Sequence, residues 1–214
     1  EIFDPLMAVH DIAGYNYPDR YFEEHYREEH ARYPDRILLG AENYLTLKNW
    51  LAVRDNPYVV GLFLWVGIDY LGESLGWPRR GWEWGIIDIG TFEKTLYYYW
   101  QAFWSEEPMV HIAVNLKEKD NFRWRAYNVA SHWNFDPANV DTVFVYSNTE
   151  KVELIQNGKS LGVKEVNPDT YQAIYIVDYK KGEITAHGFD DRKKVASHTL
   201  KTAGEPEKLV LKNE

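Results

Sequence analysis

The chain has 214 residues, 45% of them hydrophobic and 27% charged, which is typical of a folded globular protein with one large domain or two ordinary ones. The net charge of −9 argues against nucleic acid and anionic membrane surfaces as partners, because phosphate binding depends on clustered Lys and Arg. There is no cysteine, which excludes disulfides and thiolate metal sites, and no apolar run is long enough to cross a bilayer.

The first segments predict a strand followed by a helix. The chain starts at Glu1-Ile-Phe-Asp-Pro5 with neither an initiator Met nor a signal peptide, so we expect it to be a piece of a longer protein. A short, mostly apolar segment over 9–15 runs into a turn at Pro18 and predicts a strand. The charged segment 19–32 has aromatic residues at helical spacing, which predicts an amphipathic helix with Asp19 as its N-cap.

A buried strand that ends in a carboxylate is predicted next, over Ile37-Leu-Leu-Gly-Ala-Glu42. Strands of a parallel sheet are apolar on both faces, and in a closed parallel barrel their carboxyl ends open on the catalytic mouth. A charged residue at that end indicates chemistry, so Glu42 is a candidate catalytic residue. The alternative is that Glu42 is simply the first polar residue after a core strand.

The order of elements up to Trp104 predicts a parallel sheet with helices outside it. A helix is expected over 44–54, an apolar strand over 59–65 and an aromatic helix over 91–104. The Gly- and Trp-rich stretch 67–90 between them is too long for an ordinary connector, so we expect it to be functional. Three strand–helix units cannot close a barrel of eight, so they form either the tail of a barrel or a small open sheet.

The pattern changes at Ser105-Glu-Glu-Pro108. Beyond it, apolar residues alternate with other residues in short stretches separated by turn-forming residues. Asn157-Gly158, which lies between two such stretches, is a strong signal for a tight β-hairpin. Roughly seven short strands over about a hundred residues, without a helix-length pattern, predict a two-sheet sandwich.

These motifs, in this order, resemble the C-terminal end of family 2 glycoside hydrolases, the β-galactosidase and β-glucuronidase group. Asp11-Ile-Ala-Gly-Tyr-Asn-Tyr17 resembles the sixth barrel strand, and residues 37–42 resemble the seventh, whose terminal Glu is the nucleophile. Gly61-Leu-Phe-Leu-Trp65, continuing to Asp69-Tyr-Leu-Gly-Glu73, resembles the eighth strand and its loop.

The resemblance continues through the second half of the chain. The stretch from Gly85-Ile-Ile-Asp88 to Trp104 is similar to the closing loop and last helix of the barrel. Pro108-Met-Val-His-Ile112 and the motifs at 145–148 and 152–158 are similar to a sandwich appended to many bacterial members. The resemblance implies a multidomain α/β plus all-β protein. The last three βα units of an incomplete TIM-type barrel would occupy 1–107, and an immunoglobulin-like β-sandwich would occupy 108–214.

Retaining glycosidases use two carboxyl groups roughly 5–5.5 Å apart, one as nucleophile and one as acid/base. The resemblance gives Glu42 the place of the nucleophile, and Tyr17 that of a tyrosine that hydrogen-bonds and orients it. In the family the acid/base stands in an Asn-Glu pair on the fourth strand, but the only such pair here is Asn213-Glu214, outside the barrel-like part. Glu73 and Glu83 are alternative acids. The isolated chain is therefore expected to be inactive.

The resemblance also places residues around the sugar. Trp65 takes the place of the tryptophan that floors the sugar pocket, Asn16 is a candidate donor to sugar hydroxyls, and Trp82 and Trp84 are candidate substrate contacts in the loop. The alternatives are a barrel-core Trp65 and an Asn16 that only caps a turn. Aromatic residues make up 16% of the chain, which suits stacking on sugar rings, although large aromatics also simply fill cores.

Substrate choice is partly readable by resemblance. Glucuronidases carry an Asn-x-Lys motif just before the segment that matches Gly85-Ile-Ile, and Trp82-Glu83-Trp84 stands there instead. A cation for a uronate carboxylate is therefore missing, which favours a neutral sugar, foremost a β-galactoside. The best-known β-galactosidases have Asn where Trp84 stands, so the pocket is expected to differ from theirs.

Expected partners are the carbohydrate substrate and the remainder of the parent chain, with a homo-oligomer as one candidate assembly. No cofactor is expected, because no phosphate-cradling glycine motif is present, and His25 and His30 lie on different faces of their helix. The resemblance suggests a periplasmic or secreted location. Two other hypotheses stay open: a non-catalytic carbohydrate-binding module, and a structural or oligomerisation module.

Overall fold

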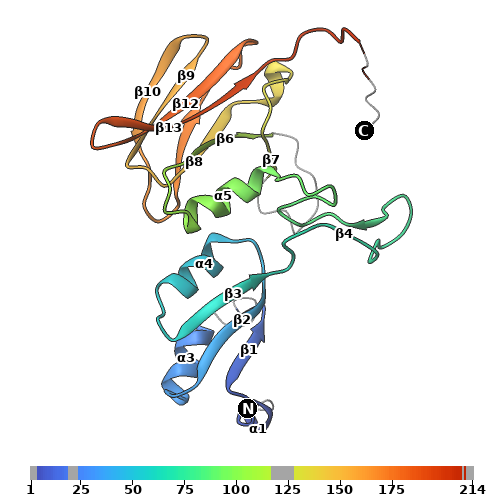
Figure 1. Ribbon diagram of the computed structural model, residues 1–214, viewed down its shortest axis with the longest axis vertical. Helices are drawn as coiled ribbons and strands as arrows, with labels where there is room; N and C mark the ends of the chain where they lie inside the picture. Colours follow the sequence, from blue (N-terminus) through green and yellow to red (C-terminus); the bar gives the residue numbers. More distant parts are fainter. Residues whose placement is uncertain (1–3, 19–23, 117–127, 209, 211–214) are drawn as a thin grey trace. The chain divides into compact units, whose positions relative to one another are not determined.

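The computed structural model describes residues 4–18, 24–116, 128–208 and 210 (Figure 1). The chain divides into two compact units, Glu1–Phe92 and Glu93–Glu214. Strands dominate and helices are few. No helix in the described ranges is long and apolar enough to span a membrane.

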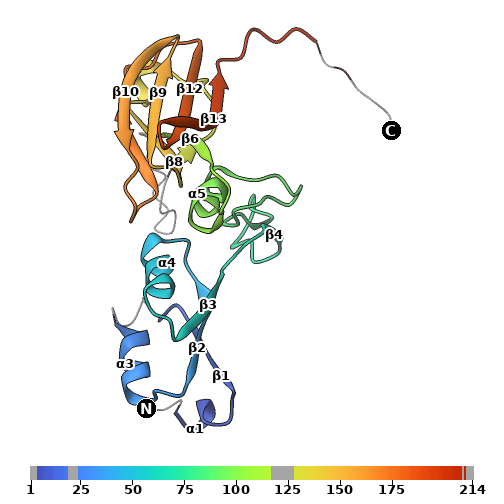
Figure 2. The ribbon, with the colours of Figure 1, turned by 60° about the vertical axis from the view of Figure 1, so that its left-hand side comes forward.

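The first unit is built on a three-stranded parallel sheet. Its strands are β1 (Ile12–Asn16), β2 (Ile37–Asn43) and β3 (Val59–Leu64), which lie side by side in chain order. After a short first helix, α1 (Asp4–Met7), the crossovers contain α3 (His25–Arg32) and α4 (Leu47–Arg54). Both crossover helices lie on the same side of the strands in Figures 1 and 2. The predicted parallel sheet with external helices is confirmed. The proposed N-cap Asp19 lies outside the described residues.

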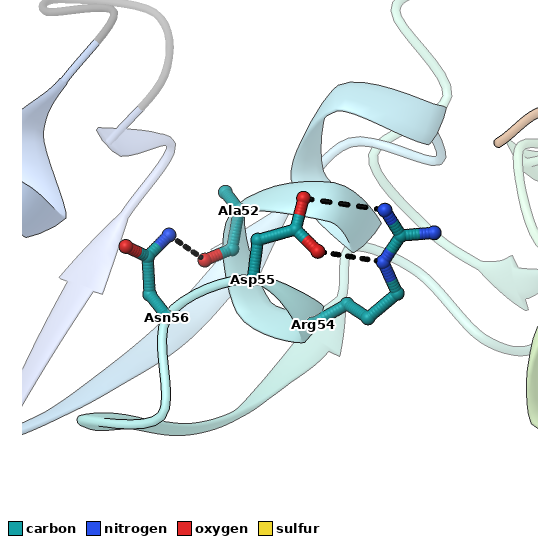
Figure 3. Close-up of polar contacts among 4 residues, drawn as sticks. All are labelled: Ala52, Arg54, Asp55 and Asn56. Carbon is teal, nitrogen blue, oxygen red and sulfur yellow. Dashed lines mark hydrogen bonds and ion pairs between the residues drawn. The ribbon is translucent and has the colours of Figure 1, made fainter.

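Local hydrogen bonds fix both ends of α4. The Thr46 side chain caps its start by accepting from the amide of Asn49 at 3.3 Å. At its end, Asn56 Nδ2 donates to the carbonyl of Ala52 at 2.6 Å, which satisfies one of the carbonyls that the last turn leaves unpaired (Figure 3). Arg54 and Asp55 form a two-point ion pair beside it, with Arg54 Nε 2.7 Å from Asp55 Oδ1 (Figure 3).

The sheet of the first unit is only partly covered. Its buried cluster contains four apolar residues among those described, Ala13, Tyr26, Leu38 and Val59. By contrast, Val60 and Phe63 of β3 are 61% and 63% exposed. Strands of parallel sheets are normally buried on both faces. The apolar residues of β3 are therefore left more exposed than is usual for such a strand.

The long loop after β3 is ordered by a small hairpin that the sequence did not predict. In it, β4 (Tyr70–Leu71) pairs antiparallel with β5 (Gly81–Trp82). Position 81 must be glycine, because a Cβ there would lie 2.2 Å from the carbonyl oxygen of Tyr70. The hairpin therefore sets the positions of the aromatic residues it carries.

The second unit contains two four-stranded antiparallel sheets, of order β10-β9-β12-β13 and β11-β8-β6-β7. The turn Asn157-Gly158 joins β9 to β10 with φ of 50° and 78°, so the predicted hairpin is confirmed. The short 3₁₀ helix Pro137–Asn139 precedes β8. The strands are β6 (Val110–Asn115), β7 (Val129–Ala130), β8 (Thr142–Ser147), β9 (Lys151–Gln156), β10 (Lys159–Glu165), β11 (Gln172–Ile176), β12 (Glu183–Asp190) and β13 (Lys193–Lys201).

The two sheets share one hydrophobic core. Alternate residues of β6 and β8 face those of β9 and β12, and all eight are fully or nearly fully buried: Ile112, Val114, Val143, Val145, Val152, Leu154, Ile184 and Ala186. Trp133 is wholly buried among them, and its Nε1 donates to the carbonyl of Lys180 at 3.0 Å, so its one polar atom is satisfied. This unit closes its core with its own residues.

Helix α5 (Thr95–Trp104) belongs to the second unit. The Tyr99 ring lies 4.6 Å from that of Tyr146 on β8, and the Phe103 ring 5.0 Å from that of Tyr171. The prediction assigned this helix to the barrel part, with a boundary at 107/108. In the structure the compact units divide before the helix, because its aromatic face packs on the β-sheet that follows it.

Candidate active site

Glu42 lies near the carboxyl end of the middle strand of the parallel sheet. A one-residue bulge shifts the β1–β2 register after Tyr15, so that Asn16, the last residue of β1, lies opposite Glu42. The amide of Tyr17 donates to the Glu42 carbonyl at 2.6 Å, and the amide of Trp65 donates to the Asn43 carbonyl at 2.9 Å. The ends of the three strands therefore bring the backbones of Asn16, Tyr17, Glu42 and Trp65 together at the carboxyl end of the parallel sheet.

Asn43 anchors the end of β2, a role that the sequence analysis missed. Its side chain is 1% exposed, and its Nδ2 donates to the carbonyl of Phe63 on β3 at 3.2 Å. Gly40 leaves room for this amide, because a Cβ at position 40 would lie 2.4 Å from Asn43 Nδ2. The Gly-x-x-Asn spacing was the available signal. It fixes the strand end on which half-buried Glu42 stands.

Tyr17 is held in an uncommon conformation directly after β1. Its φ of 50° is left-handed, which for a tyrosine is costly and occurs mostly at functional sites and tight turns. Its ring packs on Tyr44, the residue after Asn43, with the ring centroids 4.5 Å apart. The segments that leave β1 and β2 are thus locked together beside Glu42.

Aromatic rings gather along the loop after β3. Trp65 is 39% exposed and meets Tyr70 edge-on, with the ring centroids 6.2 Å apart. Tyr70 pairs with Trp82 across the β4–β5 hairpin, and the Trp82 ring contacts that of Trp84 at 4.3 Å. The loop therefore carries a connected series of rings beginning at the strand end next to Glu42.

Tyr70 connects this series to two carboxylates. Its hydroxyl donates a hydrogen bond to Glu73 Oε2. That bond, together with burial and the charges of Glu73 and Glu42, raises the pKa of Tyr70 to about 12. The Trp65 amide bonds to the carbonyl of Asn43, the neighbour of Glu42, and the Trp65 ring meets that of Tyr70, so Tyr70 lies near the strand end that carries Glu42. Tyr70 is a further site residue, and the signal for it was its place in Asp69-Tyr-Leu-Gly-Glu73.

The base of the loop is closed by its own backbone. Asp69 Oδ1 accepts from the amide of Gly85 at 2.7 Å, and the Asp69 amide donates to the carbonyl of Ile87 at 2.9 Å. A Cβ at Gly85 would lie 2.4 Å from the Asp69 nitrogen, so only glycine fits there. These contacts explain how a stretch of such length holds a fixed shape.

Other features of the first unit lie apart from these residues. A cavity opens between α3 and α4, lined by residues that include His25, Tyr26, Asn49 and Ala52, and none of the candidate site residues lines it. Within the described ranges, no group of three or more His, Asp or Glu side chains is placed to hold a metal ion.

Comparisons with known proteins point to one enzyme family. Residues 139–196 match the family described as "Domain of unknown function (DUF4982)". The chain is 32% identical over 162 residues to the β-galactosidase BoGH2A of Bacteroides ovatus, a match that covers 74% of the chain and 17% of that protein. It is 33% identical over 168 residues to a putative β-glucuronidase of Formosa agariphila, covering 76% of the chain and 15% of that protein.

The fold agrees with these relatives. The crystal structure of a glycosyl hydrolase family 2 member from Bacteroides cellulosilyticus matches 96% of the chain and 27% of its own length, with 32% identity and a TM-score of 0.82. The chain thus spans about a sixth of the curated relatives and about a quarter of this structure. The sequence matches and this structural likeness agree, and the chain belongs to glycoside hydrolase family 2.

Proposed function

We propose that the chain is the C-terminal part of a retaining exo-β-glycosidase in which Glu42 is the nucleophile. The observation that carries this proposal is the position of Glu42 at the mouth end of the middle strand, between Tyr17 and Trp65. In the proposed reaction the Glu42 carboxylate attacks the anomeric carbon while the glycosidic bond breaks. A covalent glycosyl ester forms, and water later hydrolyses it with retention of configuration.

The second carboxyl group comes from elsewhere in the parent chain. It protonates the leaving oxygen and then takes a proton from the attacking water. Tyr17 orients Glu42, and the Trp65 ring stacks on the apolar face of the sugar. Asn16 donates to sugar hydroxyls, and Trp82 and Trp84 contact the substrate from the loop at the rim of the pocket. The isolated chain is inactive, because one of the two carboxyl groups is missing.

The fold assignment forms part of the same proposal. The three strand–helix units are the end of a (β/α)₈ barrel, and the two sheets of the second unit form an immunoglobulin-like sandwich. The exposed apolar residues of β3 support the first assignment, since a complete barrel would cover them. Seven or more antiparallel strands in two sheets around one core support the second. The main partner in this proposal is the remainder of the parent chain. The family assignment also leads us to propose a homo-oligomer as a candidate assembly and a periplasmic or secreted location.

The proposed substrate is a neutral β-glycoside, foremost a β-galactoside. Support comes from the Trp82-Glu83-Trp84 stretch, which offers no cation to a uronate, and from the β-galactosidase among the relatives. Other relatives are named β-glucuronidases, so substrate preference is a point on which the relatives differ.

The nucleophile can be tested in the complete parent enzyme. Incubation with a 2-fluoro-β-galactoside that traps the covalent intermediate should add its mass to the peptide containing Glu42. Glu42→Gln should lower kcat by on the order of 10³-fold or more, because no other group forms the ester. A label on a different carboxylate, or a Glu42→Gln enzyme with ordinary kcat, would contradict the proposal.

A further inference from the structure

Tyr70 and Glu73 form a polar pair beside Glu42 that the reaction proposed above does not use. Tyr70 is fixed on three sides: its backbone pairs with Trp82, its ring meets Trp65, and its hydroxyl is bonded to Glu73. A tyrosine held in this way presents its hydroxyl oxygen in one direction.

Glu73 is directed toward Tyr70 by an unusual backbone. Its φ is 46°, and it follows Gly72, whose φ is 100°. A left-handed glutamate is uncommon, and such conformations persist where the surroundings require them, often at binding sites. Here the turn brings the Glu73 carboxylate to the Tyr70 hydroxyl at the surface of the loop.

Trp65, whose amide bonds to the carbonyl of Asn43 next to Glu42, meets the Tyr70 ring, and Tyr70 bonds to Glu73, so the Tyr70–Glu73 pair lies near the strand end that carries Glu42. A sugar hydroxyl placed there finds acceptors in Glu73 and in the Tyr70 oxygen. A uronate carboxylate placed there meets like charge, which disfavours its binding.

Glu83, the other acidic residue of this loop, is placed differently. It lies between Trp82 and Trp84, whose rings contact each other at 4.3 Å. The carboxylate of this loop that the structure places on the Tyr70 hydroxyl is that of Glu73. The acidic group associated with the site is therefore Glu73.

We propose that Glu73, held by Tyr70, is a specificity-determining residue that accepts a hydroxyl of a neutral sugar and rejects uronates. This inference rests on the proposed function of Glu42, and it adds a positive reason for a neutral substrate to the missing cation noted above. Glu73 acts on the choice of substrate, and the chemical steps stay with Glu42 and its partner carboxyl group.

The test compares kcat/KM of the complete parent enzyme for two matched pairs, 4-nitrophenyl β-galactoside with β-galacturonide and β-glucoside with β-glucuronide. Glu73→Gln, which keeps the size of the side chain and removes its charge, should lower the neutral-to-uronide ratio about tenfold or more. Glu83→Gln, the same change on the same loop, should leave the ratio within about twofold. Tyr70→Phe keeps the Glu73 charge but releases the side chain, so it should mainly raise KM for the neutral sugar.

The possible outcomes distinguish a failure of this inference from a failure of the proposed glycosidase function. An unchanged ratio in Glu73→Gln overturns the inference while wild-type hydrolysis upholds the glycosidase. Equal loss on all four substrates also overturns it, because Glu73 would then position Glu42 instead of selecting the sugar. A wild-type enzyme that prefers uronides overturns it too. A wild type that cleaves none of the four and forms no covalent adduct would remove both proposals.

Discussion

The two units of the chain differ in how much of their apolar surface they bury. Among the described residues, the second unit contains twenty-two buried hydrophobic residues, whereas the first contains five. The first unit also leaves apolar residues of β3 and of the β4–β5 loop exposed, among them Leu71 and Trp77. A closed core indicates a unit that folds by itself, and an open one indicates a unit that needs more chain.

Polar contacts also tie α3 to the sheet of the first unit. Arg36, just before β2, donates to Glu29 of α3 at 2.8 Å, and Tyr15 of β1 donates to the same oxygen at 2.7 Å. Burial and the bond to Glu29 raise the pKa of Tyr15 to about 12, so it stays protonated and donating. The guanidinium of Arg36 also covers the Tyr33 ring at 3.8 Å.

The sharpest test of this comparison is to produce the units separately. We expect residues 93–214 to be monomeric and to unfold in one cooperative transition, because their core is complete. Residues 1–92 should aggregate or lack a cooperative transition, and the whole chain should self-associate through this part. Size-exclusion chromatography and thermal unfolding followed by circular dichroism measure both. A monomeric, cooperatively folding 1–92 would show that an open parallel sheet suffices.

A matched pair of leucines measures the difference at single residues. Leu154 of β9 is 0% exposed and Leu71 of β4 is 72% exposed. Leu154→Ala should lower the free energy of unfolding of the second unit by about 2–5 kcal/mol, through lost burial and the cavity left behind. Leu71→Ala in the 214-residue chain should change the free energy of unfolding by less than about 0.5 kcal/mol. Urea titration measures both, and similar costs for the two would contradict the contrast.

Two stacked histidines in the second unit should make its stability sensitive to acid. His111 is buried between the Tyr98 ring at 3.7 Å and the His198 ring at 4.2 Å, with its Nε2 2.6 Å from the hydroxyl of Ser131. His198 Nδ1 accepts from the amide of Ile112 at 3.0 Å, which requires that nitrogen to be unprotonated. Burial, with a smaller contribution from His198, lowers the pKa of His111 from 6.5 to about 3.

The sign of the effect follows from the unfolded chain. There His111 has its ordinary pKa near 6.5 and binds a proton that the folded unit refuses, so its contribution to stability is complete above that pH. The contribution is lost as pH falls toward about 3. Between pH 7 and pH 4.5 we expect a loss of about 1–3 kcal/mol beyond that of a His111→Gln variant, measured by urea unfolding of 93–214. His187→Gln, a change in β12, serves as the control. Parallel pH curves for wild type and His111→Gln would contradict this assignment.

The smallest effect is expected at the rim of the same unit. Lys201 and Glu183 join β13 and β12 through an ion pair of 2.8 Å between exposed side chains. Because solvent and salt screen such a pair, Lys201→Met should leave the melting midpoint of 93–214 unchanged within error at physiological salt. A clear drop in the midpoint would mean that the unit depends on its surface as well as on its core.

The sequence predicted what short-range rules control. The apolar run ending at Glu42 gave a parallel strand, and Asn157-Gly158 gave the β9–β10 hairpin, because each signal lies within a few residues. The β4–β5 hairpin and the Tyr70–Glu73 pair were missed, because they depend on backbone contacts across the loop and on a left-handed glutamate that no propensity favours. The buried histidine stack was missed for a similar reason, since His111 and His198 lie far apart in the chain.

The amide side chain of Asn148 holds the connection between α5 and β6 at three points. Asn148 Oδ1 accepts from the amide of Met109 at 2.8 Å, and its Nδ2 donates to the carbonyls of Ser105 and Glu107, each at 2.9 Å. These three bonds hold the segment between α5 and β6 in one position relative to Asn148. A protein engineer who wishes to detach or graft the all-β module should therefore cut ahead of Lys94. A cut at Pro108, where the composition changes, would discard the helix. The Asn148 side chain would then lose its bonds to Ser105 and Glu107.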